Sequence, residues 1–405
     1  MSRSLSKASH NRRPWPTRAI DLILRRAASA ALRTRSTAGE LPSSKEPPRR
    51  LLIVKVFGMG DSVLMRALIE LIQRIHPEVE LGVLVGPATR ELMTTGLAVR
   101  VHEYDQKKVT PSYMFSAWRD IRSGHYEAIA NFEQGSLAGT AFLASMGARA
   151  HVGFASSADD AKCWFLSHPL KFRQSDSMWR SFLRLAQLLY PDLPDVLPSI
   201  DLPGSPEARS WVSRWWSRSV GERRSVIAMH LGSAPAMEFR RWPLERFVAL
   251  ADRITARWGD PVIVLTGTAV ERELIGEFIK RFRGTAVDAS DLGSLEKTML
   301  VLKRCQLLVS NDTGVMHLGA AVGTPTVGLF GPNSPDHWAP LGKCATYVRE
   351  TSLPCSPCLN NYLNKMPIEC TYRVTGQCMA DITVGSVEAA IARLFGREFQ
   401  VLQAQ

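Results

Sequence analysis

The chain has 405 residues, of which 45 % are hydrophobic and 22 % charged, an ordinary composition for a soluble protein of two or three domains. It contains no run of 18 apolar residues and no secretory pattern, so we expect a cytoplasmic protein without a membrane-spanning helix. The net charge is +12, but the first 50 residues hold ten arginines and two lysines against three acidic residues. The remainder is nearly neutral, which argues against a nucleic-acid partner.

Residues 1–48 are a basic segment rich in serine, arginine and proline. Within this segment, residues 20–32 have the pattern of a short basic amphipathic helix. Two interpretations stay open: a flexible tail without a core, or a contact with an anionic membrane surface. The second interpretation would make the protein peripheral on the inner membrane.

A different pattern begins after this segment and predicts an α/β domain over residues 49–195. Residues 51–56 form an apolar run typical of a buried strand, residues 63–75 have helical spacing, and residues 81–85 indicate the next strand. Strand, helix and strand in this order predict a parallel sheet covered on both faces. Further strands are expected at 126–132 and 150–154, with a helix at 137–145.

Five prolines between Pro191 and Pro206 mark a linker, after which the pattern restarts. Residues 207–385 therefore predict a second α/β domain, with strands expected at 225–230, 261–266, 307–310 and 326–330. Two doubly wound domains are the natural interpretation. Ligands of such folds bind at the carboxyl ends of the strands and between domains.

The turn after the first strand carries the first candidate site. Gly58-Met59-Gly60-Asp61-Ser62-Val63 lacks the third glycine of a dinucleotide fingerprint, so a nicotinamide site is not expected. Asp61 is either the N-cap of the following helix or a general base facing the cleft between the domains.

The second candidate site is the strand end and helix start in Ser310–His317. Small residues expose the first backbone N–H groups of this helix, an arrangement that favours a phosphate or diphosphate. Asp312 is alternatively an N-cap, and His317 is alternatively a hydrogen-bonded core histidine. Arg240 and Arg241 lie before another helix and either clamp phosphate or form a solvated loop face.

The carboxyl-terminal part of the chain concentrates cysteines and a further acidic candidate. Glu271 opens a helix and either contacts a ribose or only favours the helix dipole.

Four thiols suit a tetrahedral structural site for zinc or iron, with free or disulfide-linked thiols as the alternative; the four are Cys355, Cys358, Cys370 and Cys378.

Three segments together resemble glycosyltransferase family 9, the lipopolysaccharide heptosyltransferases. Residues 311–332 (NDTGVMHLGAAVGTPTVGLFGP) are similar to the family's signature, residues 51–86 to its amino-terminal motif, and residues 239–247 (FRRWPLERF) to its basic-x-Trp-Pro element. The resemblance implies a GT-B architecture, with two Rossmann-like domains facing across a cleft. It also implies that the terminal helix, residues 386–405, packs back on the amino-terminal domain.

The resemblance further implies inverting transfer of a heptose from ADP-heptose without a metal or other cofactor required for catalysis. By motif, Asp61 matches the general base and Arg240 a lysine that contacts the donor phosphates. The expected donor-binding residues are Gly60, Ser233, Glu271, Asp312, Thr313, Gly314 and His317. Some family members resemble this chain in a carboxyl-terminal cysteine cluster that holds iron.

Two other functions compete with this interpretation. One is a non-catalytic protein that binds a nucleotide sugar on the same fold, and the other is a sugar-nucleotide epimerase of GT-B type. The acceptor stays open at this point: a lipid-linked core, another glycan or a protein would each provide a hydroxyl.

Overall fold

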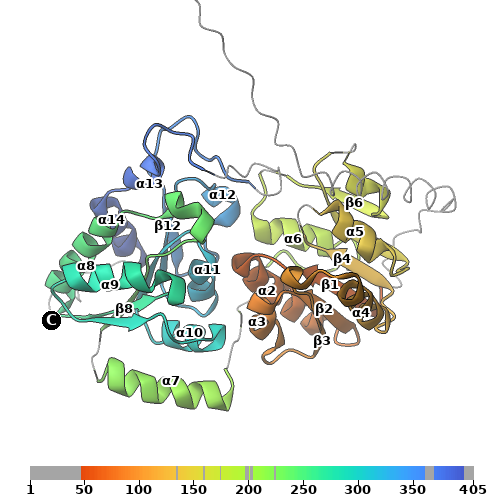
Figure 1. The fold of residues 1–405 in the computed structure, drawn as a ribbon, viewed down its shortest axis with the longest axis horizontal. Helices are drawn as coiled ribbons and strands as arrows, with labels where there is room; N and C mark the ends of the chain where they lie inside the picture. The colour runs from red at the N-terminus through yellow and green to blue at the C-terminus, as the bar shows by residue number, and fades with distance from the viewer. Residues whose placement is uncertain are drawn as a thin grey trace, which may run out of the picture.

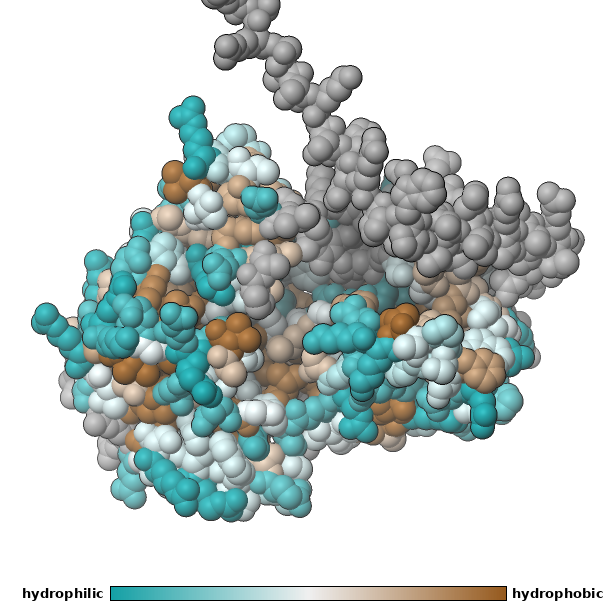
Figure 2. Space-filling model, viewed as in Figure 1, coloured by the Kyte–Doolittle hydropathy of each residue, from teal (hydrophilic) through white to brown (hydrophobic). Residues whose placement is uncertain are grey.

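The computed structural model describes residues 47–133, 136–157, 160–173, 175–196, 200, 204–222, 225–360 and 369–395. The basic segment 1–48 thus lies almost wholly outside the described residues. Within the described part, no helix is both long and apolar enough to cross a membrane. Figure 1 shows two α/β domains side by side, and Figure 2 shows hydrophobic residues at the bottom of the hollow between them.

The amino-terminal domain is built on a parallel sheet in the order β3-β2-β1-β4-β5-β6. Its strands are β1 Arg50–Lys55, β2 Glu80–Val85, β3 Val99–Glu103, β4 Ala128–Asn131, β5 Ala150–Ala155 and β6 His168–Lys171. Its helices are α2 Met59–Ile75, η1 Pro87–Thr89, α3 Arg90–Thr94, η2 Gln106–Lys108, α4 Pro111–Arg122, α5 Leu137–Ala144, η3 Ala161–Trp164 and α6 Met178–Ala186. The order reverses between β1 and β4, which makes the carboxyl ends of these two strands the expected binding position.

The carboxyl-terminal domain repeats this topology in the order β12-β11-β10-β7-β8-β9. Its strands are β7 Val226–His230, β8 Val262–Thr266, β9 Ala286–Ala289, β10 Leu307–Asn311, β11 Thr326–Leu329 and β12 Ala345–Val348. Its helices are α7 Pro206–Ser219, η4 Pro235–Arg240, α8 Leu244–Trp258, η5 Ala269–Glu271, α9 Arg272–Arg281, α10 Leu295–Leu302, α11 Gly314–Ala321, α12 Pro335–Trp338, α13 Gln377–Ala380 and α14 Val384–Phe395. Two doubly wound, Rossmann-like domains are therefore confirmed, and the second switch point lies between β7 and β10.

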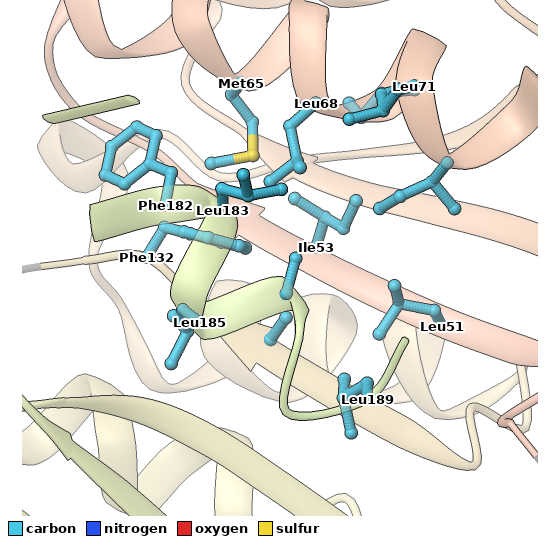
Figure 3. Close-up of a cluster of buried hydrophobic side chains, with 14 of the residues drawn as sticks. Leu51, Ile53, Met65, Leu68, Leu71, Phe132, Phe182, Leu183, Leu185 and Leu189 are labelled. Atoms are coloured by element: carbon cyan, nitrogen blue, oxygen red, sulfur yellow. The ribbon is translucent and has the colours of Figure 1, made fainter. Parts of the chain in front are cut away.

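The largest core of the amino-terminal domain lies between α2, α6 and one face of the first sheet. The apolar side chains that repeat at helical spacing on α2 point toward those of α6 (Figure 3). Met65 and Phe182 are both fully buried there, with Ile53 of β1 beside them. This packing fixes the start of α2 relative to the end of β1.

The expected position of the terminal helix is wrong for the described residues. Val387, Ala390 and Ile391 of α14 belong to the core of the carboxyl-terminal domain, and Glu388 pairs with Arg253 and Arg257 of α8. A late segment that does reach the amino-terminal domain is α12 with the residues after it. There the His337 ring pairs with the carbonyl of Asp176, and Trp338 and Leu341 pack against the amino-terminal core.

Candidate active site

Asp61 lies in the first turn of α2, beside the carboxyl end of β1, and its side chain is 7 % exposed. It does not cap the helix, because the N-cap is Gly58, whose φ of 86° suits a glycine. The Asp61 carboxylate instead pairs with Lys55, with 2.9 Å between Oδ2 and Nζ. The alternative that Asp61 is only a helix cap is therefore wrong.

A second carboxylate completes this cluster from the neighbouring strand. Glu133 follows β4, and its Oε1 lies 3.5 Å from Lys55 Nζ. The same oxygen accepts hydrogen bonds from the backbone N–H groups of Val56 and Phe57, at 2.5 and 2.8 Å. Glu133 thus fixes the loop that leads from β1 into α2, and with it the position of Asp61.

The charges of this cluster set the protonation of its members. Burial raises the pKa of Asp61, the Lys55 charge lowers it, and the charges of Glu133 and Asp312 add to the rise, so that the net shift is upward. Burial lowers the pKa of Lys55, but the two carboxylates outweigh burial and leave it raised. Lys55 therefore stays protonated while Asp61 is suited to accept a proton.

The carboxyl-terminal domain contributes a cation, Arg240, near its own switch point, as the amino-terminal domain contributes Asp61. Arg240 ends η4, and its Nη2 lies 2.8 Å from Asp312 Oδ2 and also donates to the Asp312 carbonyl. Asn333 donates to the same carboxylate oxygen at 2.5 Å. Asp312 is not the cap of α11, because Thr313 takes that position. Its carboxylate instead holds the Arg240 guanidinium at the start of the helix.

Two buried polar atoms of this group lack a hydrogen-bond partner among the described residues: Arg240 Nε and His317 Nδ1. Burial lowers the pKa of His317 to about 4, so the ring is neutral near pH 7. A buried polar group left unpaired costs about 1–3 kcal/mol. His317 is therefore not a fully hydrogen-bonded core histidine.

The helix starts of the two domains meet across the cleft, where α2 and α11 lie side by side (Figure 1). A Cβ at Gly60 would stand 2.5 Å from His317 Cδ2, and a Cβ at Gly314 would stand 2.5 Å from Met59 Cβ. Glycine is required at both positions because any side chain would collide. The contact brings Asp61 close enough to Asp312 for the two charges to interact.

Two other predicted donor residues make local hydrogen bonds at the same sheet edge. The Ser233 hydroxyl donates to the Met237 carbonyl at 2.9 Å. Glu271 forms a capping box with Thr268, whose backbone N–H donates to Glu271 Oε2 at 2.7 Å. Glu271 Oε1 also lies 3.8 Å from His230 Nε2. These contacts give both residues a structural role, and their contact with a donor stays a prediction.

Asn311 is a positioning residue that the sequence analysis missed. Its amide nitrogen donates to the carbonyls of Leu231 and Gly232, and its Oδ1 accepts from the backbone N–H of Trp242. One fully buried side chain thus ties the end of β10 to the loop after β7 and to the segment that carries Arg240.

The cysteine cluster does not fit the expected metal site. Among the described residues, which include all four cysteines, no group of three or more His, Cys, Asp or Glu side chains is placed to hold a metal ion. Burial first, then the neighbouring thiols, raises the pKa of Cys378 to about 12. The structure therefore does not support the predicted zinc or iron.

Comparisons with known proteins agree on one family. The profile described as "Glycosyltransferase family 9 (heptosyltransferase)" matches residues 114–366, more than half of the chain. The lipopolysaccharide core heptosyltransferase OpsX of Haemophilus influenzae is 22 % identical over 315 residues, which cover 76 % of this chain and 86 % of that protein.

Solved structures show the same fold. The E. coli ADP-heptose lipopolysaccharide heptosyltransferase II matches with a TM-score of 0.66 and 20 % identity over 86 % of this chain and 99 % of that one. The E. coli heptosyltransferase WaaC with ADP-2-deoxy-2-fluoro heptose matches with a TM-score of 0.59 and 18 % identity over 85 % and 99 %. The predicted GT-B architecture is confirmed.

Proposed function

The chain belongs to glycosyltransferase family 9, and from this premise we propose that it transfers a heptose from ADP-heptose to a hydroxyl of a lipopolysaccharide core acceptor, with inversion. The observation that carries the proposal is the pairing across the cleft. A buried carboxylate lies on one side, and an arginine and a histidine with unpaired polar atoms lie on the other.

Asp61 is the proposed base. Its carboxylate takes the proton of the acceptor hydroxyl while that oxygen attacks the anomeric carbon of the donor. The bond from this carbon to the diphosphate breaks, ADP leaves with the bonding electrons, and the configuration inverts because attack comes from the opposite face. The raised pKa of Asp61 suits this step, since a stronger base takes the proton more readily.

Arg240 and the start of α11 are the proposed diphosphate site. Negative charge grows on the leaving oxygen as the sugar bond breaks, and a fixed cation stabilises that growing charge. In this proposal Arg240 and His317 contact the diphosphate, and the first N–H groups of α11 add the helix dipole at Thr313 and Gly314. The chain's own residues supply both base and cation, so the proposed transfer uses no cofactor.

Transfer can be tested directly with ADP-heptose and a deacylated lipopolysaccharide core lacking heptose. We expect release of ADP together with a product heavier by one heptose, whose new anomeric configuration NMR identifies as inverted. Release of ADP without a new glycoside, or retention of configuration, would contradict the proposal. Melting-temperature shifts with ADP-heptose, UDP- and GDP-sugars identify the donor, and ADP-heptose should give the largest.

The rival functions predict different products from the same assay. A non-catalytic binder would show the melting shift without any ADP release. An epimerase would convert the donor in the absence of acceptor. The paired base and cation favour a transferase over a binder, because binding alone needs no buried carboxylate opposite the diphosphate site.

We further propose that the basic segment 1–48 attaches the enzyme to anionic membranes, where a lipid-linked acceptor would lie. Charge attraction of this kind falls as salt rises. Co-sedimentation with phosphatidylglycerol vesicles should be strong at 50 mM salt and weak at 500 mM. A variant with the arginines of this segment changed to glutamine should bind weakly at both; equal binding by the two proteins would contradict the attachment.

A further inference from the structure

One side of α4 carries two aromatic and two basic side chains at helical spacing. Phe115 is 63 % exposed, and its ring stacks on that of Trp118 with 6.1 Å between the centroids. Arg119 and Arg122 lie four and seven residues after Phe115. Residues at these spacings lie on one side of a helix. The four side chains therefore form one surface, which we call the α4 flank.

The α4 flank is held in place but is not covered. Trp118 Nε1 donates to Ser145 Oγ at 3.1 Å, just after the end of α5. The Arg122 guanidinium lies 5.1 Å from the centroid of the Trp118 ring and donates to the Met146 carbonyl at 3.2 Å. The one residue that α4 buries, Ile121, does not belong to the flank. The flank is thus an ordered surface that adds little to the core of its own domain.

Carboxylates do not balance the positive charge of the flank. In the part of the chain that the structure describes, neither Arg119 nor Arg122 forms an ion pair. The one acidic residue of α4, Asp120, is not part of the flank and already contacts His102 and Arg100, at 2.5 and 3.7 Å. The two guanidinium groups are therefore able to bind a partner that carries negative charge.

The neighbouring helix α5 continues this surface without any charged residue. Of its eight residues only Thr140 and Leu143 are buried, and the others are at least partly exposed. A surface helix of a water-soluble protein normally has charged or polar residues on its outer side. Both helices lie on the side of the amino-terminal domain that faces away from the other domain (Figure 1). A large partner can therefore bind here without closing the cleft.

We propose that the α4 flank binds an anionic membrane surface. Aromatic rings, above all that of Trp, are stable at the boundary between lipid headgroups and hydrocarbon, and arginine binds lipid phosphates. Phe115 and Trp118 enter this boundary, and Arg119 and Arg122 contact the phosphates. The inference goes beyond the attachment proposed for residues 1–48, because contact through a folded surface fixes the orientation of the amino-terminal domain on the membrane. It does not depend on the transfer reaction.

The charge of the flank is tested with the full chain by co-sedimentation with phosphatidylglycerol vesicles at 50 mM salt. A Lys or Arg near an anionic surface strengthens binding about fivefold. Arg119→Gln combined with Arg122→Gln should therefore weaken vesicle binding about 25-fold. Lys280→Gln combined with Arg281→Gln is the matched control, because it removes two exposed cations from α9 of the other domain. Equal binding by the flank variant and the control would overturn the proposal.

The aromatic part is tested with Phe115→Ser, which should weaken vesicle binding about tenfold without lowering the melting temperature. Val374→Ser is the control, because Val374 is 56 % exposed and lies in the other domain. Brominated phosphatidylglycerol quenches tryptophan fluorescence on contact, and Trp118→Phe should remove part of that quenching while it keeps a ring at this position. Wild-type binding by Phe115→Ser, or undiminished quenching in Trp118→Phe, would overturn the proposal.

The choice of acceptor separates this proposal from the proposed function. With a deacylated core in solution, the flank variants should turn over at the wild-type rate, because a dissolved acceptor needs no membrane. Absence of transfer by a wild type that binds vesicles normally would reject the proposed transfer and leave the membrane surface standing. If sedimentation velocity shows self-association that Phe115→Ser abolishes while vesicle binding is unchanged, the flank is an interface between copies of the chain, and the membrane proposal is overturned.

Discussion

The two domains that form the cleft have the same topology. They differ in how completely the polar side chains at their switch points are paired. At the first switch point, Asp61 and Glu133 both contact Lys55, so each charged side chain of the cluster has a partner of opposite charge. At the second, Arg240 is held by Asp312, yet its Nε and the Nδ1 of His317 lack partners among the described residues. One half is complete without a ligand, and the other is not.

This difference fits the role that we propose for each half. A base has to be ionised before the acceptor arrives, so the protein itself must supply the opposing charge. A diphosphate brings its own negative charge, so its site is best left with unpaired donors that the ligand satisfies. Substitutions in the first half should therefore change turnover and its pH dependence, whereas those in the second should change donor affinity together with turnover.

Asp61→Asn should have the largest effect, and that effect should be on turnover and not on donor affinity. Loss of the base should reduce turnover at least about a hundredfold, because general-base catalysis typically contributes about 10²–10⁴-fold. Donor affinity, measured by calorimetry with ADP, should stay within a few-fold of the wild type. Turnover close to the wild-type rate would mean that Asp61 is not the base.

Arg240→Ala should have the next largest effect, on the donor. A hydrogen bond to a charged group contributes about 1.5–3 kcal/mol, so the dissociation constant of ADP should rise about 10- to 100-fold. Arg281→Ala is the control, because that exposed arginine pairs only locally, with Glu277 of the same helix α9. Equal ADP affinity in the Arg240 variant and the control would contradict the diphosphate site.

The turns that carry Asp61 and Arg240 could be predicted from the sequence, but their surroundings could not. Apolar runs identify the central strands, and the glycine turn and the arginine pair mark the candidate residues. Lys55 ends an apolar strand and gives no sign of its role, and Glu133 lies 78 residues away. Only the pairing of β1 with β4 brings them together.

The same limit explains the edge strands and the terminal helix. The sequence predicts none of the four edge strands, β3, β6, β9 and β12. β3, for example, alternates with polar residues and carries little apolar pattern. The apolar positions of α14 indicate that it packs on a core, but not on which domain. In the structure α14 belongs to the core of the carboxyl-terminal domain, where the rings of Trp258 and Phe395 meet edge to face.

Lys55→Met should move the pH dependence of turnover. An opposite charge within about 4–6 Å lowers the pKa of a carboxyl by about 1–3 units, so its removal should raise the pKa of Asp61 further. The base is active when deprotonated, and activity appears as pH rises through this pKa. The acid limb of the pH–rate profile should therefore shift upward by about 1–3 pH units.

Glu133→Gln should shift the same limb in the other direction. It removes a negative charge that raises the pKa of Asp61, so the limb should move to lower pH, by less than the Lys55 shift. It keeps a side-chain oxygen for the N–H groups of Val56 and Phe57. Shifts of the same sign in the two variants would contradict the view that Lys55 and Glu133 act on Asp61 through charge.

The smallest effect is expected where the two halves are joined. Glu91 of α3 accepts from the Ser294 hydroxyl at 2.6 Å and from the Leu295 backbone N–H at 2.9 Å, so a carboxylate of one domain caps α10 of the other. Glu91→Ala leaves this helix start without its acidic partner and should lower the free energy of unfolding by about 1 kcal/mol, as the loss of a helix cap does. Glu91→Gln, which keeps the acceptor oxygen, should recover part of the loss. Urea denaturation measures the free energy of unfolding of both variants.

Glu91 contacts neither the Asp61 cluster nor the Arg240–Asp312 pair. The dissociation constant of ADP and the acid limb of the pH–rate profile should therefore stay unchanged in both variants. A change in either would mean that the cap also sets how the two halves of the cleft face one another.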